Sequence, residues 1–71
     1  MGDSNKLNLI VNGGKHASKA GNLHSLLREL GLNTANIVAE VNGSIVPGKD
    51  FGQTCLADGD VIELINFVGG G

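Results

Sequence analysis

Only one segment of this chain has the apolar spacing of an amphipathic helix. Its four leucines stand at i, i+3, i+4 and i+7, which places them on one helical face: Leu23, Leu26, Leu27 and Leu30. Asn22 is suited to cap the start of this helix, and Gly31 is suited to the left-handed position that ends it. The remaining segments have strand and turn patterns, so the sequence predicts a single main helix.

Strand patterns lie on both sides of this helix. They cover residues 7–11, 15–19, 37–41, 44–46 and 61–68. In the first, Leu7, Leu9 and Val11 alternate with Asn8 and, beyond Ile10, Asn12, and the second is polar, as expected for an edge strand. Asn12-Gly13-Gly14 and Asn42-Gly43 supply the positive-φ residues of tight hairpins, and Asp58-Gly59-Asp60 predicts a turn before the last strand. Residues 49–54 are expected to be irregular, with at most a short turn of helix.

The order of these elements predicts an α+β domain, because one helix with one apolar stripe covers only one face of a sheet. The first and last strands are the most apolar and are expected to be neighbours in the middle of the sheet. This is the β-grasp, or ubiquitin-like, arrangement: a mixed sheet of four to five strands with one main helix packed on one face. We expect a flexible N-terminus at residues 1–6, the β-grasp domain at 7–67 and a flexible glycine tail at 68–71.

Composition restricts the class of protein further. A chain of 71 residues forms one small domain, and its net charge of −2 argues against nucleic-acid binding, which needs a basic face. Cys55 is the only cysteine, so no internal disulfide is possible and a reducing compartment is expected. No apolar run approaches the ~20 residues that span a bilayer, and the first residues lack the apolar core of a signal peptide. We therefore expect a cytoplasmic protein without membrane association that is monomeric when free.

Few side chains are suited to catalysis or metal binding. His16 and His24 have no evident partner and are interpreted as ordinary surface histidines. Cys55 has no CxxC spacing or nearby histidine that would indicate a thiolate nucleophile or a metal ligand. Asp58 and Asp60 flank a turn glycine and lack the further ligands of a calcium loop. The sequence therefore predicts a protein that is not an enzyme and that has no metal site.

The sequence ends in three glycines, Gly69, Gly70 and Gly71, which would present a carboxylate on a backbone without side chains. Glycine has no Cβ, so such a tail stays mobile and is narrow enough to enter a confined active site. A group presented in this way suggests modification by another enzyme. An ordinary frayed terminus explains the tail alone equally well.

The strand that precedes the tail is apolar on both of its faces. If the helix covers Ile62 and Leu64, then Ile65 and Phe67 are left on the open face of the sheet, beside the tail. Exposed apolar patches of this kind mark partner-binding surfaces. We therefore predict that Ile65, Phe67 and Val68 contact a partner; the alternative is that loops cover them.

Three segments, in their order and spacing, resemble the ThiS family of sulfur carriers in thiamin thiazole biosynthesis. They are Val41-Asn42-Gly43-Ser44-Ile45-Val46-Pro47, Asp58-Gly59-Asp60 and Val68-Gly69-Gly70-Gly71. The resemblance covers residues 7–71. It implies that the Gly71 carboxylate is the reactive group and that Gly69 and Gly70 let the tail thread through channels where a Cβ would clash.

The resemblance also implies a set of partners. A ThiF-type adenylyltransferase would use ATP and Mg²⁺, both held by that partner, to adenylate Gly71, so this chain would bind no cofactor itself. A sulfur donor protein would then convert the adenylate to a thiocarboxylate, which would pass its sulfur to thiazole synthase. Three alternatives stay open: a carrier like the small subunit of molybdopterin synthase, a ubiquitin-like modifier that forms an isopeptide bond, and a β-grasp interaction module with an inert tail.

Overall fold

The structure is a computed structural model that describes residues 6–67. Five strands and one α-helix form the fold, joined by two short 3₁₀ helices. In chain order the elements are β1 (Leu7–Val11), β2 (Gly14–Ser18), α1 (Leu23–Glu29), η1 (Thr34–Asn36), β3 (Ile37–Val41), β4 (Ser44–Val46), η2 (Gly48–Gln53) and β5 (Val61–Asn66). The order of the strands and α1 is the one that the sequence predicts, whereas η1 is not among the predicted elements.

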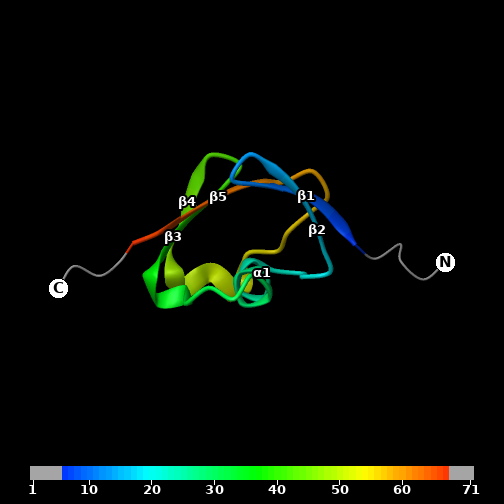
Figure 1. The fold of residues 1–71 in the computed structure, drawn as a ribbon. Helices are drawn as coiled ribbons and strands as arrows, with labels where there is room; N and C mark the ends of the chain where they lie inside the picture. Colours follow the sequence, from blue (N-terminus) through cyan, green and yellow to red (C-terminus); the bar gives the residue numbers. More distant parts are fainter. Residues whose placement is uncertain (1–5, 68–71) are drawn as a thin grey trace.

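The strands form one mixed sheet in the order β2-β1-β5-β3-β4. The β1–β2 and β3–β4 hairpins are antiparallel, whereas β5 lies parallel to β1 and antiparallel to β3. The last strand is therefore the central one, with the first strand beside it, as expected from their apolar content. Figure 1 shows β5 between the two hairpins.

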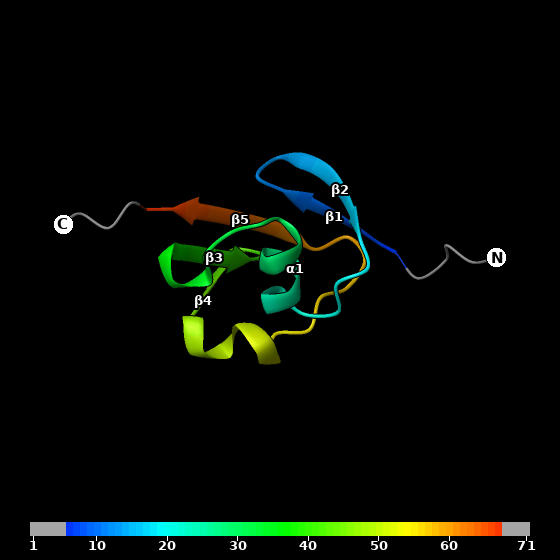
Figure 2. The same cartoon turned by 60° about the horizontal axis from the view of Figure 1, so that its bottom comes forward.

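Helix α1 and η2 lie on the same side of the sheet, as Figures 1 and 2 show. The side chains of Leu23, Leu26 and Leu27 on α1 are fully buried there, and Phe51 on η2 is 2% exposed. Inward-facing residues of the sheet complete the core: Leu9, Ile37, Ala39, Ile62 and Leu64. The leucine stripe thus covers one sheet face and leaves the other face without a helix.

The ends of α1 follow the predicted capping pattern. The Asn22 side chain accepts a 2.8 Å hydrogen bond from the backbone N–H of Ser25, so it satisfies one of the free N–H groups of the first turn. Gly31 has φ +77°, the left-handed conformation that ends a helix without strain only when the residue lacks a Cβ.

Two hairpin asparagines position the central strand. Asn12 and Asn42 both have positive φ, at 50° and 53°, as the first residues of tight turns. The Asn12 side chain accepts a 2.8 Å hydrogen bond from the backbone N–H of Leu64, and the Asn42 side chain accepts one of 2.9 Å from Val61. The turn of the β1–β2 hairpin therefore binds β5 through Asn12, and the turn of the β3–β4 hairpin binds it through Asn42.

The predicted boundaries of two elements differ from the structure. The second strand begins at Gly14 and ends at Ser18, one residue earlier at each end than predicted. The last strand ends at Asn66, where its pairing with Ile37 at the start of β3 also ends. Of the two residues predicted beyond this point, Phe67 follows the strand and Val68 lies outside the described residues.

Candidate functional site

The sheet face opposite α1 carries a group of exposed apolar side chains, which we call the outer face. These are Val38, Ile45, Val61, Ile65 and Phe67. They come from β3, β4, β5 and the residue after β5, so they extend across one half of the sheet. The other half continues through Ile10, which stands beside Val61 in the β1–β5 register.

Alternation along β5 separates the core from the outer face. Ile62 and Leu64 are 0% and 9% exposed beneath the helix, whereas Ile65 is 59% exposed. Phe67 follows the same alternation and is 46% exposed. The predicted placement of Ile65 and Phe67 on the open face is therefore confirmed, while their role in partner binding stays a prediction.

The end of β5 is held in place up to the last described residue. Asn66 pairs with Ile37, and the backbone N–H of Phe67 donates a 2.9 Å hydrogen bond to the carbonyl of Asn36. The backbone of Phe67 is therefore held by the sheet, while its ring is exposed. The other predicted site residues, Val68, Gly69, Gly70 and Gly71, lie outside the described residues.

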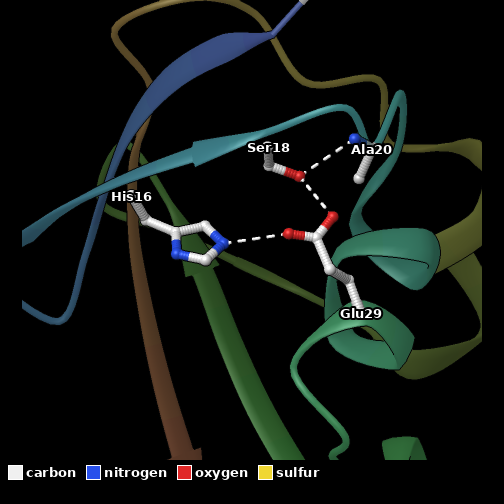
Figure 3. Close-up of polar contacts among 4 residues, drawn as sticks. All are labelled: His16, Ser18, Ala20 and Glu29. Carbon is white, nitrogen blue, oxygen red and sulfur yellow. Dashed lines mark hydrogen bonds and ion pairs between the residues drawn. The ribbon is translucent and has the colours of Figure 1, made fainter.

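His16 has no partner that the sequence reveals, but the structure gives it one on α1. Its Nε2 lies 3.1 Å from Oε2 of Glu29 on α1, as Figure 3 shows. The other oxygen of Glu29 accepts a 2.7 Å hydrogen bond from the Ser18 hydroxyl, which in turn accepts one of 2.9 Å from the backbone N–H of Ala20. Strand β2 places His16 and Ser18 on its inward side, where α1 approaches.

These contacts lower the pKa of the Glu29 carboxyl. The hydrogen bond from Ser18 is the largest cause and lowers the pKa of Glu29 below its ordinary value of 4.5. Partial burial opposes this change, and His16 adds to it by hydrogen bonding and by its charge. The cluster joins the edge hairpin to the helix on the side of the sheet away from the outer face, so we assign it a structural role.

The remaining candidates for catalysis or metal binding are Cys55, Asp58 and Asp60. Cys55 is exposed. The Asp58 carboxylate accepts a hydrogen bond from the Asn8 backbone, and the Asp60 carboxylate accepts bonds from Ala57 and Asn42. No group of three or more potential metal ligands occurs within residues 6–67. In that same range, no helix is long and apolar enough to cross a membrane.

The sequence model of the ThiS family matches residues 9–71. The chain belongs to the ThiS family. Among its relatives is the sulfur carrier protein ThiS of Bacillus subtilis, 33% identical over 57 residues that cover 80% of this chain and 86% of that protein. The crystal structure of the thiamine biosynthesis protein ThiS from Geobacter metallireducens has the same fold, with a TM-score of 0.78 and 32% identity, covering 92% of this chain and all of that one.

A second group of relatives is much longer. The thiazole synthase of Paramagnetospirillum magneticum is 35% identical over 66 residues, which are 92% of this chain but only 20% of that protein. The chain therefore spans about a fifth of the length of this relative. Family membership and the similarity to a solved ThiS structure confirm the β-grasp fold that the sequence predicts.

Proposed function

We propose that the Gly71 carboxylate of this ThiS-family protein is the group that carries sulfur for thiamin thiazole formation. A ThiF-type adenylyltransferase activates the carboxylate, and a sulfur donor protein supplies the atom that makes it a thiocarboxylate. The observation that carries the proposal is the family match, which extends through Gly69 and Gly70 to residue 71. The exposed apolar end of β5, which precedes this tail directly, also supports it.

The chemistry of a carboxylate explains why a partner is needed. A carboxylate is a poor electrophile, because its negative charge repels nucleophiles and it lacks a good leaving group. ATP converts it to an acyl-adenylate with release of pyrophosphate, and a nucleophilic sulfur of the donor protein then displaces AMP. A persulfide donor forms an acyl disulfide in this step, and a thiol cleaves it to the thiocarboxylate and a protein disulfide. ATP and Mg²⁺ belong to the adenylating partner in this scheme, and this chain supplies only the carboxylate and the surface that the partner recognises.

The glycines at 69 and 70 fit the steric demand of this reaction. A tail that enters the active site of another enzyme needs a narrow backbone, and a Cβ at either position would widen it. In this scheme the domain behind the tail acts as a recognition unit for each partner in turn.

Thiazole synthase is the proposed acceptor of the sulfur. The long relatives support this choice, because each is named thiazole synthase and contains a segment that is similar to this chain. We propose the same association between this ThiS-family domain and thiazole synthase. Val68 and the outer-face residues Ile65 and Phe67 are the proposed contacts for both partners.

Intact-mass analysis tests the proposal. The protein is incubated with the adenylyltransferase, ATP, Mg²⁺ and a sulfur donor, and we expect one terminal oxygen to be replaced by sulfur. A variant that lacks Gly71 should keep the thermal unfolding curve of the wild type and stay unmodified. An unchanged wild-type mass, under conditions that convert the Bacillus subtilis carrier, would contradict the proposal. Conjugates to lysines of other proteins would indicate a ubiquitin-like modifier instead.

A further inference from the structure

Two carboxylates face each other in the middle of the outer face. Glu40 on β3 and Glu63 on β5 are directly opposite in the antiparallel register. Their neighbours two residues away, Val38 and Ile65, are also opposite each other and exposed, so both glutamates point to the outer face. Side chains in this arrangement have Cβ atoms about 5 Å apart.

No cation compensates this pair within residues 6–67. The ion pairs of that region are His16–Glu29 and Lys49–Asp50, and neither includes Glu40 or Glu63. Like charges directly opposite on neighbouring strands destabilise a sheet. Water screens the repulsion in the free protein, because Glu63 is exposed and Glu40 is only partly buried.

The surroundings of the pair are apolar. Ile45 stands opposite Glu40 on its other side, on β4, and Val61 and Ile65 lie two residues before and after Glu63 on β5. A partner that covers these apolar side chains also removes water from the two carboxylates. Buried charges without a partner are strongly unfavourable, so such a partner must bring positive charge to this point.

A second copy of this chain does not meet that requirement. A two-fold dimer through the outer face would place the same surface of both copies in contact. If the two-fold axis passes through the pair, its centre would hold four carboxylates, whereas Lys15, the lysine that the register places on this face, stands opposite Ile10 on the edge strand β2, two strands away from Glu63. The pair therefore disfavours a two-fold dimer that is centred on Glu40 and Glu63.

We propose that the Glu40–Glu63 pair selects a partner whose apolar docking surface carries an arginine or lysine at its centre. Arginine suits the site best, because its planar guanidinium can bond to two carboxylates at once and is easily desolvated. The inference rests on the proposed function in that it takes this partner to be the adenylating enzyme. It adds the chemical feature by which that enzyme recognises the carrier.

The test compares Glu40→Gln, Glu63→Gln and the double variant with wild type. Binding to the ThiF-type adenylyltransferase is measured by calorimetry at low and high salt, and unfolding of each free variant by urea. We expect the free double variant to be at least as stable as wild type, because the repulsion is gone. Its affinity should fall by about tenfold or more and depend less on salt. Asp50→Asn, which removes one charge from η2 on the helix side, is the matched control and should bind like wild type.

Three outcomes overturn the inference or separate it from the proposed function. Equal affinity of the double variant and wild type for the enzyme, with wild type still thiocarboxylated, overturns the inference alone. Loss of affinity in the double variant without thiocarboxylation of the wild type supports the inference and contradicts the proposed function. Dimeric wild-type protein in sedimentation, dissociated by Ile65→Ser, overturns the inference by showing a second copy on this face.

Discussion

Ser18 on β2 donates a 2.7 Å hydrogen bond to Glu29 on α1, and this contact joins the edge hairpin to the helix. Ser18 is 1% exposed and is the one buried polar residue of the described chain. Its hydroxyl donates to Glu29 and accepts from the backbone N–H of Ala20, so both of its hydrogen-bonding roles are used. The contact orients the segment that leads from β2 into α1.

Replacement of Ser18 by alanine should destabilise the fold without affecting sulfur transfer. The substitution leaves the buried N–H of Ala20 without its acceptor, which costs about 1–3 kcal/mol in the free energy of unfolding. Urea unfolding measures this loss. Ala17→Ser places a hydroxyl on the exposed neighbouring position of β2 and should leave the stability nearly unchanged. An Ser18→Ala variant as stable as wild type would contradict the structural role of the cluster.

Acidification should weaken the fold partly through Glu29. Its pKa is lower in the folded protein than the ordinary value of 4.5, so the unfolded chain takes up this proton first. The stabilisation is therefore present above pH 4.5 and is lost as the pH falls through the lowered folded-state pKa. The side chain is 39% exposed, so solvent screening keeps the contribution below about 1 kcal/mol.

The pH dependence is measured on Glu29→Gln beside wild type. The amide oxygen of glutamine still accepts from Ser18, but the side chain no longer titrates in this range. We expect the difference in stability between the two proteins to shrink as the pH falls below 4.5. A difference that stays constant from neutral to acidic pH would show that the Glu29 charge contributes nothing.

Asn42 should stabilise the sheet through its side chain as well as through its backbone. Asn42→Gly keeps the positive φ but removes the bonds to Val61 and Asp60, at a cost of about 0.5–1.5 kcal/mol. Asn42→Ala removes the same bonds and strains the turn, at a further cost of about 1 kcal/mol. Urea unfolding of both variants separates the two effects. Equal stability of the glycine variant and wild type would show that water replaces these bonds fully.

Local patterns in the sequence predict α1 and the five strands, because each depends on residues that are near one another in the chain, but they do not predict η1. The leucine stripe and Asn22 define α1, and Asn-Gly pairs define both hairpins. The exposed position of Ile65 also follows from local alternation, since a strand with one covered face must show its other residues.

Contacts between distant segments could not be predicted in this way. Asn12 bonds to Leu64 across 52 positions, and His16 meets Glu29 only because β2 and α1 pack together. The Glu40–Glu63 pair requires the β3–β5 register, which depends on where two non-consecutive strands meet. Sequence reasoning therefore found the apolar part of the candidate docking face and missed its charged centre.

The two phenylalanines provide a matched test of core against docking face. Phe51 is 2% exposed beneath the sheet, and Phe51→Ala should cost about 3–5 kcal/mol of stability because it opens a cavity. Phe67 is 46% exposed on the outer face, so Phe67→Ala should leave the urea unfolding curve nearly unchanged. The same Phe67→Ala variant should bind the adenylyltransferase about tenfold more weakly or worse, since aromatic side chains that become buried in an interface contribute strongly to its energy. Calorimetric titration measures the affinity, with the exposed Cys55→Ser as a surface control away from the face. Wild-type affinity of the Phe67→Ala variant would show that the partner binds the protein at a surface that does not include Phe67.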